Sequence, residues 1–321
     1  MQKLRAGVIG VGHLGQHHAR LYATLSGATL VGVTDLDPKR AQTIADKQGV
    51  HVYPEIAALL PHVDAVSIAV PTSAHHAVAK LCLDAGVHVL VEKPITVTLA
   101  EAADLIELAR RRKRVLQVGH IERFNPAIRA VRSQINRPGF IECHRLSPYG
   151  ERGTDVDVVL DLMIHDLDMV LSFNPGAVEE VRAAGVPVLS PTIDIANARI
   201  AFTGGCVANF TASRVSTTRM RKLRLFQRDS YLSVDYQARH AAILRRQIGS
   251  NQRPEIFMEP AKTTDDEPLK LELEAFLHAI ESKTPPVVTG EDGAAALALA
   301  HQVLDAIGSF VQRHSEEAGA S

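Results

Sequence analysis

The sequence predicts an α/β domain, with a parallel sheet covered by helices on both faces, followed by a second half rich in strands. Two observations support this prediction. Up to about residue 119, continuous apolar runs alternate with amphipathic helical patterns, which is typical of a buried parallel sheet. Beyond residue 138, strand-like runs follow one another, and Thr203-Gly204-Gly205 predicts a hairpin turn between two of them. We therefore expect two domains, residues 1–119 and 120–321.

The individual elements follow from the period of the apolar residues. The strands expected in the first half are 6–9, 29–33, 65–70, 87–91 and 115–118. The helices expected between them are 13–25, 38–48, 74–85 and 99–111. The last of these opens on a capping box, because Thr98 is followed three residues later by Glu101. The second half has strand-like runs at 140–146, 177–186, 194–202, 206–214, 222–227, 231–235 and 241–246, then helices at 269–282 and 293–311.

Composition disfavours several classes of protein. The 321 residues carry a formal net charge of -1, so no overall field favours nucleic acid or a membrane surface. The three cysteines lie far apart without a CxxC pair, so we expect neither a zinc site nor a disulfide framework. No apolar stretch approaches the ~20 residues of a membrane span, and MQKLRAGVIGVG has no signal-peptide core. We therefore expect a cytoplasmic protein.

Gly10-Val11-Gly12-His13-Leu14-Gly15 fills the pattern GxGxxG between a predicted strand and a predicted helix. There the glycines allow a tight turn, close approach to a pyrophosphate and tight packing of helix on sheet. The N–H groups at the helix start would bind the pyrophosphate. Asp35, which ends the next strand before Leu36, can accept hydrogen bonds from ribose and would repel a 2′-phosphate. We expect NAD rather than NADP; a turn without a ligand is the alternative.

The run LDLMIHDLD, residues 160–168, combines apolar and ionisable residues. In a regular helix, Asp161, His165 and Asp168 would share a sector about 60° wide, beside an apolar stripe that includes Met163 and Leu167. The histidine could transfer protons, bind a metal or be a core residue. No cysteine or second histidine completes a zinc set, and we expect no metal.

The segment Glu92-Lys93-Pro94 follows the predicted strand 87–91. At the carboxyl end of a parallel strand, Lys93 would point into the crevice where such sheets bind ligands. Together with GxGxxG, Val70-Pro71-Thr72 before His75, and Asp161 with His165, this segment resembles the Gfo/Idh/MocA family of sugar and cyclitol dehydrogenases. The resemblance covers essentially the whole chain.

The resemblance implies an NAD-binding Rossmann domain and a second domain for substrate binding and oligomerisation. The second domain would be an open, mostly antiparallel sheet with helices on one face. His165 would be the base for the hydroxyl proton, Asp161 would hold its ring, and Lys93 would stabilise the developing alkoxide. A non-catalytic dinucleotide sensor, the alternative, needs neither Lys93 nor His165. The expected cofactor contacts are Gly10, Gly12, His13, Leu14, Gly15, Asp35, Leu36, Pro71, Thr72, His75, Glu92 and Lys93.

Segments 118–128 and 210–226 resemble the branch of the family that oxidises nucleotide-linked amino sugars. The resemblance implies oxidation at C3 of UDP-N-acetylglucosamine, for lipopolysaccharide and lipid A biosynthesis. Oxidation of a free sugar or inositol is the alternative. The resemblance also places Glu122, Arg123 and Asn125, where the chain enters the second domain, near cofactor and substrate. A salt bridge that crosses between the domains is the alternative for each of them. The role of Asp168 stays open between sugar binding and support of the helix.

A basic stretch extends from Arg214 to Arg228 without an acid. On a strand, Lys222 and Arg224 would share one face, and arginine forks suit the diphosphate of a nucleotide sugar. We expect Arg214, Arg219 and Arg224 to contribute to substrate binding. A solvated sheet face or a row of salt bridges between subunits is the alternative.

Strands 195–202 and 207–210 carry apolar residues in alternation. On an open sheet we expect these residues to be exposed, and exposed apolar faces of that size mark interfaces. The sequence therefore predicts a homodimer, or a homotetramer built from such dimers.

Overall fold

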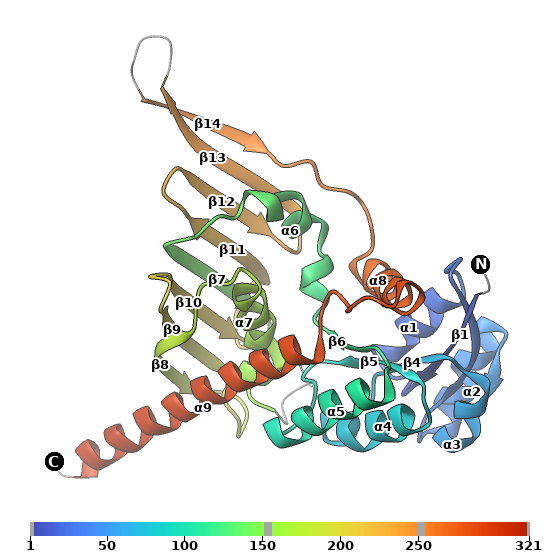
Figure 1. Cartoon of the computed structure of the whole chain (residues 1–321). Coiled ribbons are helices and arrows are strands. Elements are labelled where there is room, and N and C mark those ends of the chain that lie inside the picture. The colour runs from blue at the N-terminus through green and yellow to red at the C-terminus, as the bar shows by residue number, and fades with distance from the viewer. Residues whose placement is uncertain (1–2, 151–155, 249–253, 320–321) are drawn as a thin grey trace. The chain divides into compact units, whose positions relative to one another are not determined.

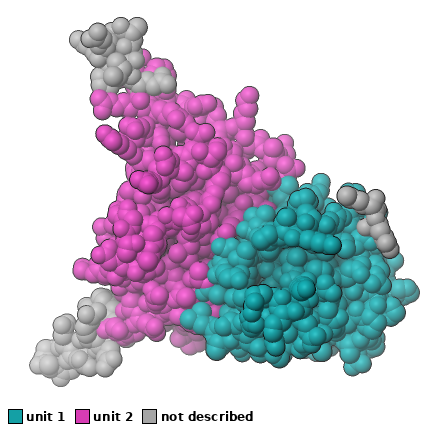
Figure 2. Space-filling model, in the orientation of Figure 1, with its two compact units in different colours: residues 1–121, 267–294 teal, residues 122–266, 295–321 magenta. Residues whose placement is uncertain are grey.

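The computed structural model describes residues 3–150, 156–248 and 254–319 and divides into two compact units (Figure 2). Unit 1 comprises residues 1–121 and 267–294, and unit 2 comprises 122–266 and 295–321. The first border lies close to the one expected after residue 119. The sequence predicted a single border, but residues 267–294 also belong to unit 1. The reason is that the apolar side of α8 (Pro268–Ser282) joins the core that packs on α1 (Gly15–Tyr22).

Unit 1 contains a six-stranded parallel sheet in the order β3-β2-β1-β4-β5-β6 (Figure 1). The strands are β1 (Leu4–Ile9), β2 (Ala28–Thr34), β3 (His51–Val52), β4 (Ala65–Ile68), β5 (His88–Glu92) and β6 (Leu116–Gly119). The predicted parallel sheet is confirmed. Only β3 was not expected, because two residues are too few to show a period.

Helices cover both faces of this sheet. Ala6 and Val8 of β1 share a core with α1, α2 (Pro38–Gln48) and α8, whereas a Cβ on Gly7 between them would meet Leu59 of α3 (Ile56–Leu59). Beyond η1 (Leu60–His62), α4 (Thr72–Asp84) packs beside α5 (Leu99–Arg112) (Figure 1). The expected capping box at Thr98 and Glu101 is present.

Unit 2 is built on an eight-stranded sheet in the order β14-β13-β12-β11-β7-β10-β9-β8 (Figure 1). Strands β7 and β10 are parallel, and the other neighbours are antiparallel. The strands are β7 (Phe140–Leu146), β8 (Val178–Val186), β9 (Ile195–Phe202), β10 (Val207–Ser213), β11 (Met220–Phe226), β12 (Ser230–Asp235), β13 (His240–Ile248) and β14 (Pro254–Pro260). The mostly antiparallel second sheet is confirmed; β14 was not expected.

One face of this sheet packs against helices and forms the core of unit 2. The covering elements are α6 (Pro126–Val131), η4 (Val159–Met163), α7 (Ile164–Leu171) and α9 (Gly290–Gly319). The short helices η2 (Ile121–Phe124) and η3 (Arg132–Gln134) flank α6 in the chain. Ala196, Ala198 and Ile200 of β9 are buried in this core. The expectation that the alternating apolar residues of β9 and β10 are exposed is therefore wrong, because they face the helices.

The helix that begins near residue 159 is not regular. Val159–Met163 forms a π-helical turn, and an α-helix follows over Ile164–Leu171. The expected apolar stripe is confirmed at Met163 and Leu167, which are fully buried. Single π turns are frequent at functional sites, so this departure from the predicted 3.6-residue period draws attention to the segment that carries Asp161 and His165.

Candidate active site

The glycine turn between β1 and α1 has the geometry that a dinucleotide site needs. Gly10 has a φ of 81°, and a Cβ on Gly15 would lie 1.8 Å from the carbonyl oxygen of Gly10. Neither position tolerates a side chain. A Cβ on Gly12 would meet nothing within 4 Å, which leaves open space for a phosphate at the start of α1.

Asp35 closes this turn from the end of β2. Its Oδ2 accepts a hydrogen bond from the Val11 N–H at 2.8 Å, and Oδ1 accepts one from Arg40 at 3.0 Å. Burial alone would raise the pKa of Asp35, but the backbone hydrogen bonds from Asp37 and Val11 and the Arg40 guanidinium outweigh it and lower the pKa. The carboxylate is therefore charged, as recognition of ribose hydroxyls requires. Leu36 beside it is fully exposed.

The segment after β4 is tied to the Lys93 segment by a buried histidine. His75, on α4, lies 2.8 Å through Nδ1 from the Pro94 carbonyl oxygen and 3.0 Å through Nε2 from that of Val70. Burial lowers its pKa. His75 therefore links the backbone of Val70 to that of Pro94, and its predicted contact with the cofactor stays a prediction. Pro71 and Thr72 lie at the start of α4.

Glu92 supports Lys93 from the end of β5. Its Oε1 lies 3.0 Å from Nε2 of the buried His18, and its Oε2 accepts from the Lys93 N–H at 3.3 Å. Burial alone would raise the pKa of Glu92, but His18 and the charge of Lys93 outweigh it and lower the pKa. Glu92 is therefore a carboxylate beside a half-buried lysine. Sequence reasoning missed His18, because nothing near it in the chain indicates Glu92.

In unit 2, Asp161 lies in η4 and His165 one turn later in α7, and both are half-buried. Lys93 belongs to unit 1. The joint role of these three residues stays a prediction.

The face of α7 next to His165 is held by a buried ionic cluster that the sequence did not reveal. Asp166 accepts from Arg145 of β7 at 2.8 and 2.9 Å, and Glu122 accepts from the same guanidinium at 2.9 Å. All three side chains are at most 7% exposed. Two carboxylates satisfy one buried guanidinium, which is the condition for a buried charge. The cluster fixes α7, and with it His165, on the sheet.

Two further predicted substrate residues have partners within unit 2. Arg123 donates to both carboxylate oxygens of Asp168, at 2.6 and 2.8 Å. Asn125 is buried, caps α6 through the Ala127 N–H and donates to Glu122. Arg123 and Asp168 pair within unit 2, so this ion pair is not the domain-crossing salt bridge of the alternative, and the substrate-binding roles stay predictions. The geometry favours structural roles for all three.

The basic stretch does not form one surface. Arg214 is buried and donates to Asp194 at 2.7 Å, to the Val156 carbonyl and to Ser190. These contacts give the Arg214 guanidinium a structural role within unit 2, and its expected role in substrate binding stays a prediction.

Lys222 and Arg224 share one face of β11, as expected, while Leu223 and Leu225 are buried on the other. That shared face is the one away from α7. Arg224 also lies 3.5 Å from Glu142 of β7. Arg224 is thus separated by the sheet from His165, which argues against the expected contact with the same substrate. Arg219 is exposed just before β11.

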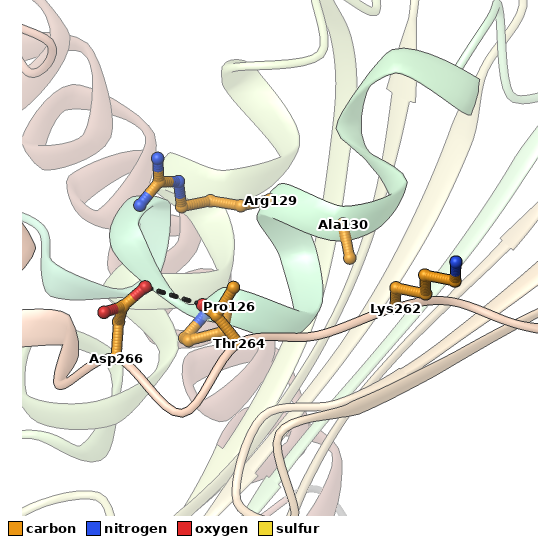
Figure 3. Close-up of a pocket in the computed structure, with 6 residues that line it drawn as sticks. All are labelled: Pro126, Arg129, Ala130, Lys262, Thr264 and Asp266. Carbon is orange, nitrogen blue, oxygen red and sulfur yellow. Dashed lines mark hydrogen bonds between the residues drawn. The ribbon is translucent and has the colours of Figure 1, made fainter.

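A shallow pocket of about 260 Å³ lies elsewhere in unit 2, between α6 and the segment after β14 (Figure 3). Arg129 and Ala130 reach it from α6, and Thr264 donates to Asp266 at 2.7 Å on the other side. The pocket contains none of the predicted site residues.

Among the described residues, no three His, Cys, Asp or Glu side chains are grouped to hold a metal ion. No helix in the described part of the chain is long and apolar enough to cross a membrane.

Comparison with known proteins places this chain in a family. Residues 4–120 match the Gfo/Idh/MocA oxidoreductase family with an NAD-binding Rossmann fold, and residues 127–229 match the Gfo/Idh/MocA C-terminal domain. The chain belongs to the Gfo/Idh/MocA family of oxidoreductases. The predictions of an NAD-dependent enzyme and of an NAD-binding Rossmann domain are thereby confirmed.

Relatives within the family include a nucleotide-sugar dehydrogenase and an inositol dehydrogenase. The chain is 42% identical over 315 residues to UDP-N-acetylglucosamine 3-dehydrogenase of Acidithiobacillus ferrooxidans, covering 98% of this chain and 100% of that protein. A solved structure of that enzyme from the same organism has a TM-score of 0.91 at 40% identity, over 97% of this chain and 99% of that one. Myo-inositol 2-dehydrogenase of Thermotoga maritima is 26% identical over 93% of this chain and 94% of its own.

Proposed function

We propose that this protein oxidises the C3 hydroxyl of UDP-N-acetylglucosamine to the 3-keto sugar, with NAD as oxidant, in the synthesis of lipid A and lipopolysaccharide. The observation that carries this proposal is the 42% identity to UDP-N-acetylglucosamine 3-dehydrogenase over 98% of the chain. The open glycine turn and the charged Asp35 carboxylate support NAD as the cofactor.

In the proposed reaction the hydroxyl proton and a hydride leave the same C–OH group, and a ketone, NADH and a proton are formed. NAD, when bound, supplies the hydride acceptor. His165 takes the hydroxyl proton, since imidazole titrates near working pH. Asp161 orients the ring and stabilises the imidazolium. The Lys93 ammonium, whose charge helps to lower the pKa of Glu92, stabilises the developing alkoxide.

The test is a substrate panel. Purified protein is incubated with NAD and UDP-N-acetylglucosamine, UDP-N-acetylgalactosamine, free N-acetylglucosamine or myo-inositol, and NADH formation is followed. A 3-keto-sugar aminotransferase is added to remove the product and drive the reaction forward. We expect the UDP-linked N-acetylglucosamine to give the highest kcat/KM. Equal or faster turnover of the free sugar or of inositol contradicts the nucleotide-sugar assignment.

We also propose that copies of the chain associate through the open face of the eight-stranded sheet, as a homodimer or a homotetramer of such dimers. Support comes from an apolar row that crosses the face in register: Met258, Leu244, Tyr231, Phe226, Phe140, Val207 and Ala201. The ring of Phe226 lies 5.6 Å from that of Phe140 and 4.9 Å from that of Tyr231, between centroids. Contiguous exposed apolar surface of this kind marks interfaces.

Light scattering tests the assembly. Wild-type protein should have at least twice the monomer mass of 34.8 kDa at micromolar concentration. Phe226→Glu should shift it toward the monomer, because a buried charge without a partner is costly at an interface. A wild-type monomer contradicts the proposal.

A further inference from the structure

The cations of the basic stretch occupy different environments, and Arg221 stands apart from the others. Arg214 is buried against Asp194, and Lys222 and Arg224 each lie beside an acid on the open face of the sheet. Arg221 lies on the other face of β11, with Leu223 and Leu225, where the helices pack. It is half-buried.

The strand register places Arg221 beside the ionic cluster that holds α7. Arg221 is directly opposite Arg145 of β7, and its carbonyl oxygen accepts from the Tyr236 N–H at 3.0 Å. Arg145 in turn bonds Asp166, the residue that follows His165. Arg221 therefore lies on the same face and at the same end of the sheet as the helix with the predicted base.

The nearby carboxylates are already engaged. Both oxygens of Asp166 and one of Glu122 accept from Arg145, and the other oxygen of Glu122 accepts from Asn125. Among the described residues, Arg221 has no hydrogen-bonded acceptor for its guanidinium and no ion-pair partner within 4.0 Å. Burial and the charges of Arg145 and Arg219 lower the pKa of Arg221, and together they outweigh the opposite effect of the Glu122 and Asp166 charges.

A half-buried guanidinium has lost part of its hydration, so it gains more than an exposed one from an anion that pairs with it. A diphosphate provides such an anion, and its oxygens match the guanidinium fork. We propose that Arg221, assisted by the exposed Arg219, binds the diphosphate of the nucleotide-sugar substrate on the helix-covered face of the second sheet. This proposal rests on the nucleotide-sugar substrate proposed above.

A structural role would predict a different result. Glu122 and Asp166 carry two negative charges against one positive charge on Arg145. In a purely structural role, Arg221 would do no more than balance the remaining negative charge of this cluster. In that case, removing its charge would lower the melting temperature and leave ligand binding intact. Binding of UDP separates the two roles, because uridine shares the base and ribose but lacks the phosphates.

The experiment measures UDP and uridine affinity by calorimetry, with the full chain and NADH present. Arg221→Gln should weaken UDP binding roughly tenfold to a hundredfold, the range expected for a lost charge-assisted hydrogen bond, and should leave uridine and NADH binding unchanged. Arg221→Lys, which keeps the charge but not the fork, should give an intermediate loss. Arg129→Gln, a change of an exposed arginine on α6, is the matched control and should bind UDP as wild type does.

Wild-type UDP affinity in a folded Arg221→Gln protein overturns the proposal, whatever its melting temperature. If that variant does not fold, Arg221→Lys takes its place, and unchanged UDP affinity there overturns the proposal equally. If UDP affinity is unchanged in the variant but the wild-type protein oxidises UDP-N-acetylglucosamine, the proposal for Arg221 is wrong and the proposed function is still supported. If wild-type protein binds UDP no better than uridine and does not oxidise the UDP-sugar, the proposed function fails as well.

Discussion

The glycine turn of unit 1 and the basic stretch of unit 2 differ in how far a residue's role depends on distant parts of the chain. Gly10 and Gly15 meet each other within one turn, and Asp35 reaches Val11 from the adjacent strand. Arg214, Arg221 and Arg224 are close in sequence, yet their surroundings differ. Arg214 pairs with a buried acid and Arg224 with an acid on the open face of the sheet, whereas Arg221 has no ion-pair partner among the described residues. Backbone geometry is decided locally, whereas the function of a cation is decided by what the fold places beside it.

The largest loss of turnover is expected at His165, the predicted base in the segment 160–168 of unit 2. His165→Ala should lower kcat by ~10²–10⁴, which is the usual contribution of a positioned general base. NADH affinity, measured by fluorescence titration, should stay at the wild-type value. Lys93→Ala should also lower kcat strongly, because the developing alkoxide loses its positive partner. Turnover close to wild type in His165→Ala would remove this residue from the mechanism and show that the motif is structural.

A second large effect concerns the buried partner of Arg214. Asp194→Asn should lower the free energy of unfolding by about 3–5 kcal/mol near neutral pH, because it leaves a buried arginine uncompensated. Burial alone would raise the pKa of Asp194, but Arg214, Ser190 and backbone N–H groups outweigh it and depress the pKa.

The pH dependence of that stability follows from the sign of the shift. With a folded pKa below the unfolded value of about 3.9, the Asp194 contribution is complete above that pH and is lost as the pH falls toward the folded pKa. Urea unfolding should therefore show the largest difference between wild type and Asp194→Asn near neutrality, and a smaller one in acid. A constant difference would mean that Asp194 does not act through its charge.

Much of the fold was predictable because it depends on local periods. Continuous apolar strands and amphipathic helices predicted the parallel sheet, and the capping box placed the start of α5. The cluster of Arg145, Glu122 and Asp166 was not predictable, because its members come from three elements that only the fold brings together. The face of β9 was misjudged for the same reason: alternation shows that two faces differ but not which one the helices cover.

A smaller effect, on cofactor affinity, is expected at Asp35 beside the glycine turn, whose geometry depends on residues close in the chain. Asp35→Ser should weaken NAD binding roughly tenfold, since one charge-assisted hydrogen bond to ribose is lost. It should also improve NADP binding, because Arg40, which pairs with Asp35 at 3.0 Å, becomes available to a 2′-phosphate. Dissociation constants for both cofactors check this, with Asp35→Ser/Arg40→Ala as the control that should lose the gain. A wild-type preference for NADP would contradict the role given to Asp35.

The smallest effect is expected at Arg224, and it sharpens the contrast with Arg221. Both are arginines of β11, but Arg224 lies on the open face beside Glu142, with 44% of its side chain exposed. An exposed ion pair contributes at most about 1 kcal/mol, and no substrate held at His165 reaches this face through the sheet. Arg224→Gln should therefore leave KM for the UDP-sugar and the affinity for UDP at their wild-type values, as measured in the assays used for Arg221→Gln. A clear loss of UDP affinity would restore the open face as the diphosphate site. If both variants bound UDP normally, no arginine of this strand would serve the substrate.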